Sequence, residues 1–201
     1  MSLKIFAAAG ALAGLLQLAF LMHFAAPLAE KLHDALAAGE EEEGYAWWAG
    51  YLVASLSGAL WGMVLGAFAH RFGLFKGAAL AFLAFSLLPG LKWLPTPHGV
   101  SYVEDVVWRE AVHGLYLLFN GAVIWLAGRA RDASGVVAVA ALLATGFFAF
   151  PSFTLPERYL PYLPELLALQ AVAVFSWALF WAALAVTAYA ASPLRRPWRW
   201  Y

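Results

Sequence analysis

The sequence contains no cysteine, and this absence removes several kinds of chemistry at once. Without thiols the chain can form no disulfide, no thiolate metal site and no iron–sulfur cluster of its own. No Walker A loop and no HExxH motif occurs either, so the residues for ATP hydrolysis or zinc proteolysis are missing. We therefore expect no enzymatic activity.

Charge is also scarce. Lys, Arg, Asp and Glu make up 12% of the 201 residues, about half the usual share for a soluble domain. The formal net charge is zero, so the chain has no electrostatic footprint for nucleic acid, and we expect no such partner.

Hydrophobic residues are abundant instead. They make up 64% of the chain, and the mean hydropathy is +0.76. A soluble protein of this size could not bury so much apolar surface. The composition therefore predicts an all-α polytopic transmembrane helical bundle, with residues 1–201 as a single integral membrane domain whose surroundings are the lipid bilayer.

The apolar residues form about six blocks of near-membrane length. Pro89–Gly90 should kink the third span or end it early, because proline removes a backbone donor. Ala54, Gly58, Gly62 and Gly66 recur every four residues in the second span, so another helix should approach it closely. The predicted spans are about 4–28, 45–69, 74–94, 106–128, 135–153 and 164–191.

The basic residues set the predicted orientation. Six spans place both termini on one side, together with eight of the twelve Lys and Arg residues. The positive-inside rule makes that side cytoplasmic, in a prokaryotic plasma membrane. The opposite side carries most of the acids, including the run Glu40–Glu43. The eight residues are Lys4, Arg71, Lys76, Arg129, Arg131, Arg195, Arg196 and Arg199.

The first candidate site begins the fourth span. Glu110 and His113 are one turn apart on a helical face, a spacing that metal sites in helical bundles use. Arg109 and Asn120 lie on the same side of this helix. The alternative interpretation is a short ion-pair network at the membrane surface.

The second candidate site lies at the outer end of the first span, where His23, Glu30 and His33 follow helical spacing. Carboxylate oxygen and imidazole nitrogen suit divalent ions such as Co²⁺, Ni²⁺ or Zn²⁺. The alternative here is a polar interfacial helix. The full set of predicted metal ligands is His23, Glu30, His33, His98, Glu110 and His113, with bound Co²⁺ or Ni²⁺ as the candidate cofactor.

The remaining polar residues are explained by structural roles at helix ends, at the membrane interface or between helices. Glu104 and Asp105 should cap the fourth span, because acids complement the dipole at a helix N-terminus. Lys92 should extend along the apolar surface to the interface. Five residues could line a pathway or pack between helices: Gln17, Pro89, Arg109, Asn120 and Gln170.

The end of the third span and the segment after it carry a recognisable pattern. It comprises Leu87, Leu88, Pro89, Leu91, Lys92, Pro95, Pro97, Gly99, Val100 and Arg109. Over about residues 54–116 this order resembles the CbtA family of predicted cobalt transporter subunits. The chain differs from that family at Thr96 and His98 and in having a sixth span. The resemblance implies cobalt uptake for cobalamin synthesis, with a small single-span partner of the CbtB type that carries metal-binding histidines.

Two hypotheses follow. The first is a permease, or permease subunit, for a divalent metal cation that meets an outward-facing site of acids and histidines. The second is a non-catalytic accessory subunit of a larger membrane protein complex, favoured by the small-residue stripe and the abundant aromatic residues.

Overall fold

The computed structural model describes residues 2–36, 47–96, 100–127 and 132–192. In these ranges the ordered elements are helices and none is a strand, which confirms the predicted all-α class. Among the described residues, four helical segments are long and apolar enough to cross a membrane: Leu3–Phe24, Trp48–Phe72, Leu74–Lys92 and Glu157–Ala190.

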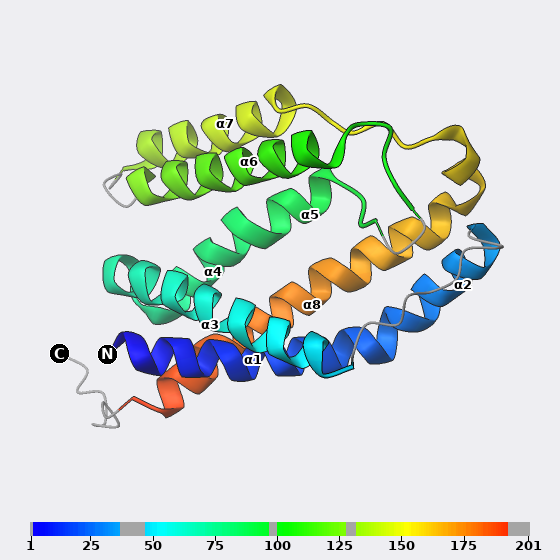
Figure 1. The fold of residues 1–201 in the computed structure, drawn as a ribbon. Coiled ribbons are helices and arrows are strands. Elements are labelled where there is room, and N and C mark those ends of the chain that lie inside the picture. Colours follow the sequence, from blue (N-terminus) through cyan, green and yellow to red (C-terminus); the bar gives the residue numbers. More distant parts are fainter. Residues whose placement is uncertain (1, 37–46, 97–99, 128–131, 193–201) are drawn as a thin grey trace.

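The chain runs back and forth along one direction (Figure 1). Helix α1 (Leu3–Phe24) is continued by α2 (Ala26–Leu36), and α3 (Trp47–Phe72) returns beside α1. The next pass consists of α4 (Leu74–Phe82), a π-helical turn η1 (Leu83–Leu87) and α5 (Leu88–Lys92).

The second half adds a helical hairpin and one long helix. Helices α6 (Val106–Ala127) and α7 (Ala133–Ala149) lie side by side in one layer, with α1 and α3 on the opposite side of the molecule (Figure 1). A 3₁₀ turn η2 (Glu157–Tyr162) then leads into α8 (Leu163–Ala190), which packs on α1, α4 and α5. The start of α1 and the end of α8 lie at the same end of the bundle (Figure 1).

The predicted close approach to the second span is confirmed, and the approaching helix is α1. A Cβ atom added to Gly58 would lie 2.2 Å from the backbone oxygen of Gly10, and one added to Gly62 would lie 2.0 Å from that of Phe6. Gly10 and Gly14 of α1 therefore match the stripe on α3, and the two backbones touch without intervening side chains. A stripe occupied by α1 is not free for a partner protein.

Pro89 does not end the third pass. The backbone widens to the π-helical turn η1 just before it, and the Leu88 amide donates to the Leu83 carbonyl five residues back. The Ala84 carbonyl thereby loses its usual α-helical donor, and its π-helical donor would be residue 89, a proline without an N–H. Nδ2 of Asn120 in α6 donates to this carbonyl at 3.3 Å instead.

The fifth predicted span, 135–153, is shorter than expected at its outer end. Helix α7 stops at Ala149, and Phe150 adopts an extended conformation (φ −68°, ψ 142°). The residue before a proline avoids the helical region because it would clash with the proline ring. Pro151 therefore keeps Phe150 out of the helix, and Ala149 is the last helical residue.

The prediction of capping acids is confirmed for Asp105 and wrong for Glu104. Asp105 Oδ1 accepts from the amides of Val107 and Trp108, at 2.8 and 3.2 Å. Both carboxylate oxygens of Glu104 instead accept from the Thr154 amide, at 2.9 and 3.0 Å, and thus tie the segment before α6 to the segment after α7. Desolvation acts to raise the pKa of Glu104, but these hydrogen bonds outweigh it and hold the pKa below its ordinary value.

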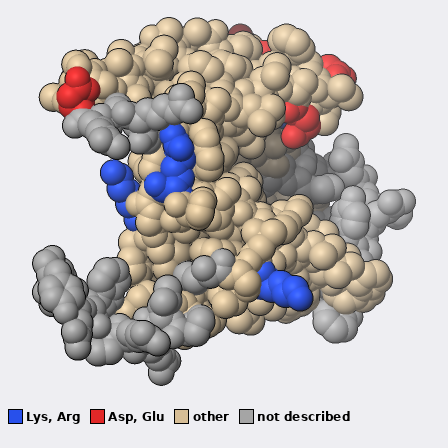
Figure 2. Space-filling view, turned by 90° about the vertical axis from the view of Figure 1, so that its left-hand side faces the viewer, with Lys and Arg blue, Asp and Glu red and all other residues tan. Residues whose placement is uncertain are grey.

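Charge is unevenly distributed between the two ends of the bundle. Lys4, Arg71 and Lys76 belong to the end where α1 begins, and Figure 2, which looks onto that end, shows small groups of Lys and Arg side chains and a few separate acidic groups amid a largely uncharged surface. At the opposite end, the described acids outnumber the described bases. The acidic run Glu40–Glu43 and the arginines at positions 129, 131, 195, 196 and 199 lie outside the described residues.

Candidate solute-binding cavity

A cavity of about 360 Å³ lies in the half of the bundle opposite the basic end. Its walls come from α3, the η1–α5 segment, α6, α8 and the segment that joins α5 to α6. Its volume is at the lower end of the range for small-molecule sites. The polar lining residues are Ser86, Thr96, Tyr102, Arg109, Glu110, His113 and Gln170, and the aromatic ones include Trp61, Phe85, Trp93, Phe153 and Trp177.

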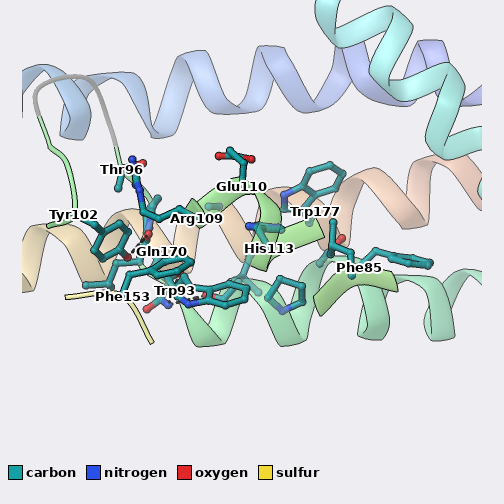
Figure 3. Close-up of a pocket in the computed structure, with 18 of the residues that line it drawn as sticks. Phe85, Trp93, Thr96, Tyr102, Arg109, Glu110, His113, Phe153, Gln170 and Trp177 are labelled. Atoms are coloured by element: carbon teal, nitrogen blue, oxygen red, sulfur yellow. Dashed lines mark hydrogen bonds between the residues drawn. The ribbon is translucent and has the colours of Figure 1, made fainter. Parts of the chain in front are cut away.

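A stack of three rings fixes one wall. Trp93 is buried between His113 and Phe153, with ring centroids 5.3 and 5.1 Å away and interplanar angles of 27° and 15°. Its indole nitrogen donates to the Pro151 carbonyl at 3.2 Å. The imidazole of His113 is therefore held at the cavity surface by contact with an anchored ring (Figure 3).

Arg109 carries the positive charge of the cavity. Its guanidinium carbon lies 5.4 Å from the ring centroid of Tyr102, whose hydroxyl donates to the Leu94 carbonyl at 2.8 Å. Its Nε atom is buried and has no hydrogen-bond partner among the described residues. An arginine nitrogen shielded from water without an acceptor is costly, so this guanidinium is suited to receive one.

Glu110 lies at the rim. Its side chain is exposed, and it points away from Arg109, which extends toward Tyr102 (Figure 3). No ion pair joins Glu110 to Arg109 within the described chain. The two neighbours in sequence thus present opposite charges to different parts of the opening.

Gln170 joins α8 to the end of the third pass. Its amide nitrogen donates to the carbonyls of Gly90 and Trp93, at 2.6 and 3.3 Å, so the residue both lines the cavity and fixes α5. The ammonium group of Lys92 donates to the Phe147 carbonyl near the end of α7, and the prediction that Lys92 reaches the membrane interface stays a prediction. Free carbonyls at a helix C-terminus attract such a cation.

The cavity brings together five of the residues singled out from the sequence: Pro89, Arg109, Glu110, His113 and Gln170. His23 and Glu30 are exposed on α1 and α2 and do not line it. His33 is half-buried on α2, with Nδ1 3.8 Å from the Asp34 carboxylate. His98 lies outside the described residues.

Two other predicted polar residues join helices. Gln17 of α1 donates to the Ser176 hydroxyl of α8 at 3.2 Å, and the fully buried Asn120 donates to Ala84 as described above. Both therefore act in packing rather than at the cavity surface. Within the described chain, no group of three His, Asp or Glu side chains is close enough to hold a metal ion.

The sequence did not indicate the aromatic lining. Tryptophans in a hydrophobic chain are typical of interfacial belts and packing, so Trp61, Trp93 and Trp177 carried no separate signal. Trp93 and Tyr102 do flank the proline-rich segment that follows the kinked span, and this position is the one feature that could have marked them.

Comparison of the chain with models of protein families, with curated proteins and with solved structures gives no match in any of the three. The resemblance to the CbtA family therefore depends on the sequence pattern alone.

Proposed function

We propose that this protein is a solute permease, or the solute-binding subunit of one, in the plasma membrane of a prokaryote. The proposal includes six membrane spans, with both termini in the cytoplasm. The observation that carries it is the cavity, whose lining includes one guanidinium, one carboxylate and one imidazole in a chain that is mostly apolar. Ionisable groups at membrane depth are costly and are typical of solute pathways.

The charge distribution supports an outward-facing cavity. Lys4, Arg71 and Lys76 lie at the end where α1 begins, and the positive-inside rule assigns that end to the cytoplasm. The cavity lies in the other half of the bundle, so its rim at Glu110 would face the outside. Gln170, Pro89 and the π-helical turn form the wall that a change in α5 would open or close.

Because the chain has no cysteine, single cysteines can test this arrangement without background. We expect Glu110→Cys to react with a membrane-impermeant maleimide added to intact cells, whereas Lys76→Cys should react only after the cells are permeabilised. Leu184→Cys, at a fully buried position, should not react under either condition. Labelling is measured by the mass shift of the purified protein, and labelling of Lys76→Cys in intact cells would contradict the proposed orientation.

A divalent cation is a second proposal for the solute. The observation that favours it is that Glu110 and His113, one helical turn apart, both line the cavity. Arg109 lines the same space and repels a cation, and the remaining predicted ligands lie elsewhere or outside the described chain. Such a cation would bind through two side chains, and water molecules would remain as its other ligands.

Calorimetry with purified protein tests the cation directly. On this second proposal, Co²⁺ and Ni²⁺ release or absorb heat on binding, and His113→Ala abolishes the signal, since it removes half of the protein ligands. His23→Ala, outside the cavity, is the matched control and should leave the binding unchanged. If the unaltered protein gives no heat of binding with either ion, a divalent cation is excluded as the solute.

The accessory-subunit hypothesis remains the competing proposal. One observation behind it, the small-residue stripe on α3, is accounted for by α1. Co-purification of the protein with a fixed larger complex, together with no outside labelling of Glu110→Cys, would favour it over a permease.

A further inference from the structure

We propose that the cavity binds a small organic carboxylate, with Arg109 holding the carboxylate group and the aromatic wall contacting the apolar body of the ligand. This inference rests on the proposed function, because it names the solute class of the same cavity.

The unpaired nitrogen of the Arg109 guanidinium points to an anionic ligand. Arg109 has a buried Nε without an acceptor among the described residues. Of the two nearby acids, Glu104 is engaged through both oxygens with the Thr154 amide, and Glu110 is exposed and directed away. Neither carboxylate forms an ion pair with the guanidinium among the described residues, although the charge of Glu104 acts on it, and a planar carboxylate ligand matches the donor geometry of the guanidinium.

Tyr102 restricts the direction from which an acceptor can approach. The guanidinium carbon of Arg109 lies over its ring, 5.4 Å from the centroid, and the tyrosine hydroxyl donates to the Leu94 carbonyl. A cation–π contact holds the guanidinium through its charge and forms no hydrogen bond to an oxygen acceptor. Arg109 is thus held in position without using its hydrogen-bonding capacity.

The remaining lining selects for an apolar body. Trp61, Phe85, Trp177 and Val174 face the same space, whose volume of about 360 Å³ greatly exceeds that of an inorganic anion. Burying apolar ligand surface against such a wall contributes affinity that acetate or phosphate cannot gain. The Arg109 guanidinium and the apolar wall together favour an aromatic or branched monocarboxylate over an inorganic anion.

The test uses the full-length protein in detergent, with benzoate as the probe and tryptophan fluorescence and calorimetry as readouts. We expect benzoate to bind at least about tenfold more tightly than acetate or inorganic phosphate. Arg109→Gln should weaken benzoate binding by about tenfold or more, the usual loss for a charge-assisted hydrogen bond, and Arg109→Lys by less.

Arg158→Gln is the matched control. Arg158 also lies over a tyrosine ring, at 4.7 Å from that of Tyr159, but it does not line the cavity, so benzoate binding should not change. The inference is overturned if benzoate does not bind, if phosphate binds as tightly, or if Arg109→Gln keeps the original affinity. In each of these cases, outside labelling of Glu110→Cys would still support a solute cavity, whereas loss of that labelling would overturn the proposed function itself.

Discussion

Replacing Gly58 by alanine should destabilise the protein by about 3 kcal/mol, near the upper end of the usual cost of overpacking. The new methyl group would lie 2.2 Å from the backbone oxygen of Gly10. A backbone atom cannot move aside as a side chain can, so α1 and α3 would have to separate along their length. Thermal unfolding in detergent, followed by circular dichroism, measures the effect.

Gly50→Ala is the control for this experiment. Gly50 lies in the same helix, and an added Cβ there would meet no atom within 4 Å. Alanine is the better helix former, so this variant should be neutral or more stable by up to about 1 kcal/mol. Equal melting temperatures for Gly58→Ala and Gly50→Ala would show that α1 does not pack on the stripe.

The second large effect is expected at Asn120, where Asn120→Leu should cost about 2 kcal/mol. The substitution leaves the Ala84 carbonyl without a donor in an apolar interior, and an unsatisfied buried polar group costs about 1–3 kcal/mol. The amide itself is fully buried, so water cannot replace it. Chemical or thermal unfolding of the purified variant gives the free-energy change.

A second substitution distinguishes this explanation from a simple packing defect. Pro89→Ala supplies the backbone N–H that the π-helical turn lacks, and the Ala84 carbonyl then has a donor within its own segment. Asn120→Leu should therefore cost at least about 1 kcal/mol less in the Pro89→Ala background than alone, a coupling of the size expected for residues that share one partner. Strictly additive costs would refute the role assigned to Asn120.

Much of the helical framework could be predicted from the sequence. The bounds of α3, α6 and α8 lie within a few residues of the predicted spans, because long apolar runs and the prolines and acids at their ends are local signals. The glycine stripe predicted a close helix contact, and Asp105 predicted a cap, since both effects depend on neighbouring residues of one helix. Even the break at Pro89 was predictable, although its form as a π-helical turn was not.

The candidate site was predictable only in part. Arg109, Glu110 and His113 share one stretch of α6, and the sequence identified them together. Gln17, Asn120 and Gln170 looked alike in the sequence, yet the structure places the first two at helix contacts and the third at the cavity. His23 and Glu30 belonged to a second candidate site in the sequence, and in the structure neither lines this cavity.

By itself the sequence determined that this protein is a set of apolar helices with one polar interruption and a basic end. The tertiary structure decided which side of each helix faces its neighbours. In a soluble protein the alternation of polar and apolar residues conveys that choice, but a helix surrounded by lipid is apolar on both its packed and its exposed sides. Hydropathy therefore located the helices, and only side-chain packing brought Arg109 and His113 together with Gln170 and the tryptophans around one cavity.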